Sequence, residues 1–253
     1  MKQGETSPLL SERERQRYHR QILLIGEEGQ ERLKRSRVFI AGAGGLGSPV
    51  AMYLAAAGTG ILTLADHDAV DLSNLNRQVL HWDADVGRPK TESAVGKLRA
   101  MNPDIEIRAI DRTIDRSNVD ELTRGYDMIV DAMDNYPTRY LLNRAAIRHR
   151  IPFIHGAIRG FDGQVMTVIP GKTACLRCIF PSALPAEQFP VIGVTPGIIG
   201  LIQANEVIKF LLGTGELLGN RLLIWDGLRS TLDRIEVQRN PACPDCGEME
   251  KQP

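Results

Sequence analysis

The sequence has no excess of charge, few cysteines and no long apolar run, and each absence excludes a class of protein. Its 253 residues include 31 basic and 31 acidic side chains, so no overall field favours nucleic acid or an anionic membrane surface. The longest apolar stretches, such as residues 198–202, fall far short of the roughly 18 to 20 residues that cross a bilayer. The N-terminal segment is too polar for a secretory signal. We therefore expect a soluble cytoplasmic protein with neither a membrane nor a nucleic-acid partner.

The only four cysteines form two pairs with the same short spacing, Cys175-x-x-Cys178 and Cys243-x-x-Cys246. In a reducing compartment this arrangement favours a metal over disulfides. Two such pairs far apart in the chain have the spacing of a tetrahedral four-cysteine zinc site without an open coordination position. We expect structural zinc that fixes the segment after Gly171 to the C-terminal segment. An iron-sulfur or redox pair and unligated thiols are the alternatives.

Apolar segments alternate with helical patterns as far as residue 156. Residues 1–35 are rich in Glu, Arg and Gln and predict a helical arm, in which Ser11 and Glu14 match a capping box. Strands are expected at 38–41, 61–66, 105–110, 127–131 and 152–155. Helices are expected at 49–57, 91–101, 117–123 and 137–149. This alternation predicts parallel βαβ units in a Rossmann-like, doubly wound α/β sheet.

The pattern changes after residue 156. Residues 161–170 predict an antiparallel strand and turn, so the parallel sheet is expected to continue into antiparallel strands. Residues 180–196 contain four prolines and predict a loop. A helix at 197–212 and strands at 221–226 and 232–238 follow.

A glycine-rich turn separates the first expected strand from its helix, with Gly42, Gly44 and Gly47 in the spacing G-x-G-x-x-G. Glycines there let backbone N–H groups approach phosphate oxygens at a helix N-terminus. Asp66, at the end of the second strand, lies where an acidic residue binds a ribose hydroxyl. The motif alone favours a dinucleotide dehydrogenase. It leaves open ATP, other nucleotides and a junction that binds nothing.

The residues that follow Asp66 favour a triphosphate. Asn74, Asn76, Arg77 and Gln78 lie in one short polar stretch, and Lys90 follows soon afterwards. Cations near a phosphate-binding turn suit a reaction in which negative charge grows on a leaving phosphate, whereas hydride transfer develops no such charge. A solvated loop is the alternative interpretation.

The sequence DAMDN places Asp131 and Asp134 at the carboxyl end of an expected strand, the edge where ligands collect in such sheets. A carboxylate there can hold magnesium against phosphate oxygens. A helix N-cap is the alternative role for Asp134. The histidines, including His81 and His155, lack metal-ligand spacing and are expected to be packed or on the surface.

Taken together, these motifs resemble the ThiF, MoeB and HesA family of adenylyltransferases, which activate ubiquitin-like sulfur carriers for molybdopterin or thiamine synthesis, and more distantly the ubiquitin-activating enzymes. The ordered matches are RYHRQI, GAGGLG, DHDAVDLSNLNRQVLH, VGRPK, DAMDN, the paired CxxC motifs and GIIGLIQANEVIKFLLG. The resemblance implies one adenylyltransferase domain over residues 1–253. Its parts would be a helical arm at 1–35, a nucleotide-binding part at 36–156 and a partner-binding and zinc part at 157–253.

The resemblance also implies roles for individual residues. Asp66 would bind the ribose, Arg77 the phosphates and Lys90 the α-phosphate during attack. Asp134 would position magnesium, and Arg20 would reach the γ-phosphate site of the other subunit in a homodimer. The implied nucleotide contacts are Gly42, Gly44, Gly45, Gly47, Asp66, Ser73, Asn74, Leu75, Asn76, Arg77, Lys90, Asp134 and Asn135.

The implied reaction is acyl adenylation by ATP of the C-terminal glycine of a small β-grasp partner ending in Gly-Gly. Family members that form a covalent sulfur intermediate place a cysteine before the GV...P...G segment, whereas this chain reads AEQFPVIGVTPGIIG there. We therefore expect adenylation without an enzyme–partner sulfur adduct. The alternatives are adenylation of a small carboxylate or a modified tRNA base, a nicotinamide-dependent oxidoreductase, and a non-catalytic scaffold for a β-grasp protein.

Overall fold

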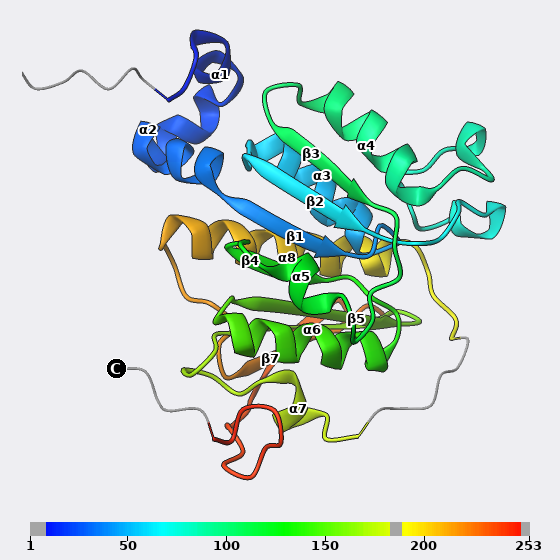
Figure 1. Ribbon diagram of the computed structural model, residues 1–253, viewed down its shortest axis with the longest axis vertical. Helices are drawn as coiled ribbons and strands as arrows, with labels where there is room; N and C mark the ends of the chain where they lie inside the picture. The colour runs from blue at the N-terminus through cyan, green and yellow to red at the C-terminus, as the bar shows by residue number, and fades with distance from the viewer. Residues whose placement is uncertain (1–8, 183–188, 249–253) are drawn as a thin grey trace, which may run out of the picture.

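One eight-stranded sheet organises the protein in the computed structural model, which describes residues 9–182 and 189–248 (Figure 1). The strand order is β3-β2-β1-β4-β5-β6-β7-β8. Pairs from β3 through β5 are parallel, and pairs from β5 to β8 are antiparallel. The strands are β1 Arg37–Ala41, β2 Ile61–Ala65, β3 Glu106–Ile110, β4 Met128–Asp131, β5 Phe153–Arg159, β6 Asp162–Val168, β7 Arg221–Asp226 and β8 Thr231–Glu236. The prediction of a doubly wound sheet that continues into antiparallel strands is confirmed.

Helices cover both faces of this sheet. In Figure 1, α5 and α6 lie in front of the strands, and α3 and α8 lie behind them. The α-helices are α1 Glu12–Arg17, α2 His19–Arg35, α3 Gly47–Ala57, α4 Lys90–Met101, α5 Val119–Thr123, α6 Tyr136–His149, α7 Leu176–Ile179 and α8 Val194–Leu212. In the two described ranges, none of the helices is long and apolar enough to span a bilayer.

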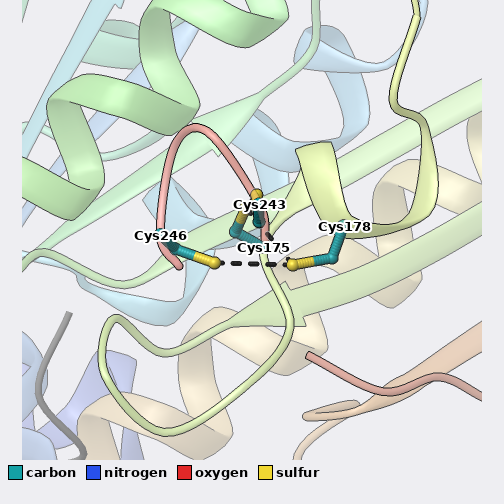
Figure 2. Close-up of side chains that lie close together, drawn as sticks. All are labelled: Cys175, Cys178, Cys243 and Cys246. Carbon is teal, nitrogen blue, oxygen red and sulfur yellow. Dashed lines mark hydrogen bonds between the residues drawn. The ribbon is translucent and has the colours of Figure 1, made fainter. Parts of the chain in front are cut away.

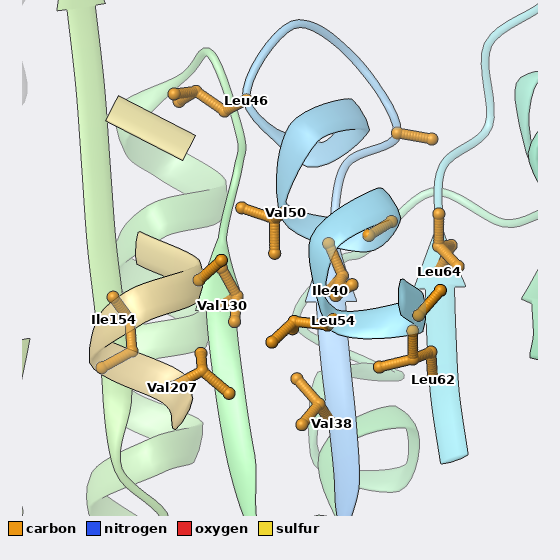
Figure 3. Close-up of a cluster of buried hydrophobic side chains, with 14 of the residues drawn as sticks. Val38, Ile40, Leu46, Val50, Leu54, Leu62, Leu64, Val130, Ile154 and Val207 are labelled. Atoms are coloured by element: carbon orange, nitrogen blue, oxygen red, sulfur yellow. The ribbon is translucent and has the colours of Figure 1, made fainter. Parts of the chain in front are cut away.

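Two hydrophobic clusters fill the layers between sheet and helices. Val38 and Ile40 of β1 face α3 and α8, in the cluster drawn in Figure 3. Phe39 and Ala41, the alternate residues, face the layer that contains α5 and α6. Because successive side chains of a strand point to opposite faces, a parallel strand covered on both sides needs an unbroken apolar run. The segment VFIA meets that requirement, and all four of its side chains are buried.

The helical arm lies at the end of the molecule opposite the cysteine-bearing segment (Figure 1). The expected capping box is confirmed: the backbone N–H of Ser11 donates to Glu14 Oε2 at 2.8 Å, and the N–H of Glu14 donates to Ser11 Oγ at 3.3 Å. Lys34 pairs with the same carboxylate at 2.6 Å and so joins α1 to α2. Gly26 interrupts α2 with a φ of +71°.

Three local predictions differ from the structure. The strand expected at 152–155 continues to Arg159, because β5 turns directly back into β6. Helix α8 begins at Val194 rather than at residue 197, since a proline such as Pro196 is tolerated in a first helical turn. The short helix α7 was not expected. Within the predicted loop, residues 183–188 lie outside the described part of the chain, as do residues 1–8 of the arm.

The strand order fixes where a ligand meets the sheet. From β1 the chain passes outward to β2 and β3, and it then returns to place β4 on the other side of β1. The connections that leave β1 and β4 therefore diverge, and in sheets of this kind the ligand-binding crevice is expected at the carboxyl edge between these two strands. The glycine turn follows β1, and the DAMDN segment follows β4.

Candidate active site

The glycine turn at the end of β1 contains two kinds of glycine. Gly42 has a φ of +101°, and a Cβ on Gly47 would lie 1.9 Å from the Gly42 carbonyl oxygen. The folding of the turn itself therefore requires both. By contrast, a Cβ on Gly44 would lie 3.5 Å from its nearest neighbouring atom, an ordinary contact distance. A Cβ on Gly45 would lie 3.3 Å from its nearest neighbour, which is only slightly too close. Among the described residues, the N–H groups of Gly44 and Gly45 have no hydrogen-bond partner. These two donors are available to an anion.

Asp66 supports this turn from the end of β2. Its Oδ2 accepts a hydrogen bond from the Ala43 N–H at 2.8 Å, and its Oδ1 accepts one from the Asp68 N–H at 2.9 Å. Each carboxylate oxygen has a second lone pair, so these bonds leave acceptors for a ribose hydroxyl. Asp66 thus lies beside the turn, where the sequence placed it.

Arg77 also lies beside the turn, on the polar segment after β2. A short 3₁₀ helix, Leu72–Asn74, begins this segment, and Asp71 caps it through the Ser73 N–H at 2.8 Å. The hydroxyl and N–H of Ser73 lower the pKa of Asp71. The Arg77 guanidinium donates to Ser73 O at 2.9 Å and to Asn76 Oδ1 at 3.0 Å. Its Cγ would lie 3.6 Å from a Cβ on Gly45, so the stem of the Arg77 side chain lies beside the turn.

Lys90 is the first residue of α4, and its side chain is 7% exposed. Its Nζ pairs with Asp68 Oδ2 at 2.7 Å, and its backbone N–H donates to the Asp68 carbonyl at 2.9 Å. Asp68 in turn donates its N–H to Asp66. The second cation is therefore linked to the glycine turn through two aspartates, of which the sequence had indicated only Asp66.

The two aspartates that follow β4 have different environments. Asp131 is fully buried: its carboxylate contacts His155 Nδ1 at 2.7 Å and accepts from the Met133 N–H at 3.1 Å. Asp134 is exposed, and the one contact of its carboxylate in the described chain is the Asn135 amide at 3.4 Å. The N-cap of α6 is Asn135, which accepts from the Thr138 N–H at 2.9 Å. The alternative role of Asp134 as the N-cap is therefore wrong.

Arg20 is exposed, and no hydrogen bond or ion pair within the described residues connects it to the glycine turn. It belongs to α2, which lies near the end of the sheet where β1 begins, whereas the glycine turn lies where β1 ends (Figure 1). An action of Arg20 at a phosphate would thus require a second subunit.

The four cysteine sulfurs gather into one cluster, drawn in Figure 2. Three sulfur–sulfur distances are 3.8 Å for Cys175–Cys178, 3.6 Å for Cys175–Cys243 and 3.4 Å for Cys178–Cys246. A tetrahedral ion with zinc–sulfur bonds of about 2.3 Å separates its sulfurs by roughly 3.8 Å. The four thiols are free rather than disulfide-bonded, and all four sulfurs lie within 4.8 Å of one another. The donor set and its spacing therefore fit zinc.

The asparagine Asn143 of α6 joins the two cysteine pairs. Its Oδ1 accepts from the Leu176 N–H at 3.0 Å, and its Nδ2 donates to Asp245 Oδ2 at 3.0 Å. Leu176 lies within the first pair and Asp245 within the second. Burial, reinforced by the neighbouring sulfurs, raises the pKa of the Cys175 thiol. A divalent cation would relieve that cost by binding the thiolate.

Comparison with known proteins decides the family. The model of the ThiF family matches residues 18–245. The chain belongs to the ThiF family. It is 48% identical over 240 residues to the SAMP-activating enzyme E1 of Haloferax volcanii, covering 92% of this chain and 88% of that protein. It is 45% identical over 245 residues to the sulfur carrier protein adenylyltransferase of Thermus thermophilus, covering 92% of this chain and 90% of that protein.

A solved structure of E. coli MccB with ATP has the same fold as this ThiF-family chain, with a TM-score of 0.82 and 26% identity. That match covers 92% of this chain and 75% of MccB. The prediction that the chain is an adenylyltransferase is confirmed at the level of enzyme class by its relatives.

Two histidines of this ThiF-family protein are buried and make hydrogen bonds that the sequence did not indicate. His81 and His155 are 3% and 0% exposed, and each makes hydrogen bonds through both ring nitrogens. The prediction of packed histidines holds for both. Their bonding partners are distant in sequence, so no local motif could have revealed them.

Acid should lower the stability of this ThiF-family protein through these two rings. Burial lowers the pKa of both rings. Asp131 raises the pKa of His155, but this effect is smaller than that of burial. The unfolded chain takes up a proton on each ring below about pH 6.5, while the folded chain does so only at lower pH. The free energy of unfolding therefore falls as the pH drops from about 7 toward 5, by at most about 1.4 kcal/mol per pH unit for each histidine.

Urea unfolding at a series of pH values measures this loss. The variant His81→Gln removes one titrating ring, so its stability should fall less steeply with acid. A slope equal to that of the wild type would contradict the assignment to His81.

Proposed function

We propose that this protein uses ATP to adenylate the C-terminal glycine carboxylate of a small ubiquitin-like sulfur carrier. The observation that carries the proposal is the position of the Arg77 side chain beside Gly45, in a turn where the N–H groups of Gly44 and Gly45 lack partners in the described chain. Relatives named as activating and adenylylating enzymes for carrier proteins support it. So does the likeness to MccB, which was solved with ATP.

The chemistry asks for alignment and charge neutralisation more than for proton transfer. A carboxylate oxygen of the carrier attacks the α-phosphorus of ATP, and the bond from this phosphorus to the oxygen that bridges it to the β-phosphate breaks. Pyrophosphate departs, and the carrier remains as an acyl-adenylate. The carboxylate is already a nucleophile at neutral pH. The N–H groups of Gly44 and Gly45, together with Arg77 and Lys90, would hold the phosphates and stabilise the charge that develops on them. Asp66 would orient the ribose.

Asp134 is the residue we assign to magnesium. Its carboxylate is exposed at the carboxyl edge, and the neighbouring Asn135 is engaged as a helix cap, so the donor fits a hard cation. Asp134 would hold this ion, which would supply positive charge to the phosphates. Asn135 contributes by fixing the start of α6 and by donating to the Asp134 carboxylate. The zinc assigned to the four cysteines is structural.

We assign carrier docking to residues 157–253. The antiparallel end of the sheet carries exposed apolar side chains, including Leu228, Leu232 and Ile235. Exposed apolar side chains of this kind favour a protein partner. All four cysteines of the sequence lie in the cluster, so sulfur would come from another protein or from sulfide. A thiol-sensitive adduct with the carrier would contradict this assignment.

We further propose a cytoplasmic homodimer. Leu23 and Leu24 of α2 and Tyr53 of α3 are large apolar side chains with more than half of their surface exposed, at 72%, 86% and 57%. A second copy would bury this surface and bring its Arg20 to the phosphates. The dimer would then be part of the catalyst.

The decisive experiment is ATP–pyrophosphate exchange with a carrier ending in Gly-Gly. We expect exchange that requires the carrier and is lost with a carrier lacking its last glycine. Exchange that ignores the carrier would favour another acceptor, such as a small carboxylate or a tRNA base. Tight binding of NADH without exchange would favour the oxidoreductase alternative and refute the proposal.

A further inference from the structure

A buried histidine contacts the backbone of the glycine turn, and the proposed chemistry assigns it no role. The Nε2 of His81 lies 2.8 Å from the carbonyl oxygen of Ala43, in the middle of the turn. Its Nδ1 lies 2.9 Å from Ser93 Oγ on α4. The ring is 3% exposed and therefore reaches no ligand itself.

The hydrogen-bond partners of His81 determine which of its ring nitrogens carries the proton. A carbonyl oxygen only accepts, so the contact with Ala43 requires a hydrogen on Nε2. In a neutral ring Nδ1 is then a bare acceptor, and the Ser93 hydroxyl is the group placed to donate to it. Lys97 donates to Ser93 Oγ at 2.8 Å, and the same hydroxyl also lies near the Asp85 carboxylate, whose pKa it lowers. These contacts join Lys97, Ser93 and His81 to the turn.

Both polar groups of Ala43 are consequently held. Its N–H donates to Asp66 Oδ2 at 2.8 Å, and its carbonyl accepts from His81. The described chain has no cis peptide bond, and in a planar trans peptide the carbonyl and the following N–H point in opposite directions. Fixing the Ala43 carbonyl toward His81 therefore turns the Gly44 N–H away from the protein interior.

We propose that His81 is a positioning residue that fixes the Ala43–Gly44 peptide so that the Gly44 N–H donates to a phosphate of the bound nucleotide. This inference rests on the proposed function, because it requires ATP at the turn. Without the donor at Nε2, the peptide is free to rotate. The turn would then lose a preorganised hydrogen bond to a charged group.

The test compares the affinities for ATP and for adenosine, measured by calorimetry and by competition. In His81→Leu, which resembles histidine in volume but has no donor, ATP should bind roughly tenfold more weakly. Adenosine should bind within about twofold of the wild type, since it has no phosphate. His81→Gln places an amide N–H near the Nε2 position and should restore ATP binding to within about threefold of the wild type.

The outcomes separate the inference from the function on which it rests. A wild-type protein that binds ATP no better than adenosine refutes nucleotide-phosphate binding itself. A wild type that prefers ATP, with the same preference in His81→Leu, overturns the inference and leaves the function intact. Equal losses in His81→Leu and His81→Gln also overturn it, because packing rather than the donor would then matter. If His81→Leu does not fold, His81→Gln and Ser93→Ala decide: Ser93→Ala should weaken ATP binding but not adenosine binding.

Discussion

Replacing Lys90 with methionine should lower carrier-dependent ATP–pyrophosphate exchange by roughly 100- to 1,000-fold, the usual cost of losing one preorganised donor at a developing charge. The substitution keeps an unbranched apolar chain as far as the ε carbon and removes the ammonium group. The Nζ of Lys90 lies at the carboxyl edge of the sheet, 2.7 Å from Asp68, which is itself bonded to Asp66. The other basic side chain that contacts Asp68 is His67, which lies 3.4 Å from Asp68 Oδ1 and lacks the permanent charge of a lysine.

Stability should change little in this variant, because the Asp68 side chain is 52% exposed and remains solvated without its partner. Lys209→Met is the matched control. That lysine pairs with Glu206 on α8, about 20 Å along the helix from Pro196 beside the turn. Exchange should survive in the control. If Lys90→Met retained exchange within threefold of the wild type, Lys90 would not contact the phosphate.

Replacing Cys246 with serine, or removing the metal with a chelator, should lower the melting temperature by roughly 10 °C or more. A structural zinc site contributes its binding free energy to folding, and losing it costs on the order of 5 kcal/mol or more. In a chain of this size each kcal/mol corresponds to about 2–4 °C. The cluster joins two segments that are far apart in the sequence, so losing the metal loosens both of them.

Metal analysis of the purified protein should give one zinc per chain, and Cys246→Ser should contain less than the wild type. The chelator should have no further effect on that variant. Visible absorption by the wild type would instead indicate an iron-sulfur cluster. A wild type without metal, with an unchanged melting temperature in Cys246→Ser, would leave the cluster as unligated thiols.

The regular part of the fold could be predicted because its physical signals are local. The apolar run before Gly42 can only be a strand covered on both faces, and the spacing of Gly42 and Gly47 encodes a turn that no larger residue could make. The antiparallel strand after residue 160 was predicted, but the strand expected at 152–155 was too short, because β5 continues to Arg159 and only Gly160 and Phe161 separate it from β6. Local sequence signals thus predicted the order of the helices and strands more accurately than the residues at which they begin and end.

The candidate site divides in the same way. Asp131 and Asp134 are alike in sequence, and only the tertiary structure buries one against His155 and exposes the other. The partner of Lys90 lies 22 residues away, and that of His81 lies 38 residues away at Ala43. Residue types at a sheet edge can be predicted from a pattern. The hydrogen-bond partners of these residues come from distant parts of the chain, and a local sequence pattern does not show that those parts lie together.

The cysteine cluster also has a consequence for the order in which the chain folds during synthesis. Cys178 and Cys246 are 68 residues apart, and the second pair is made long after β4 and α6. The strands β1 to β4 that surround the crevice come entirely from the residues before Ala132. The nucleotide half is therefore free to assemble first, as N-terminal units generally do. Closure of the cluster then marks a late step, in which the second cysteine pair is fastened to a half that is already folded.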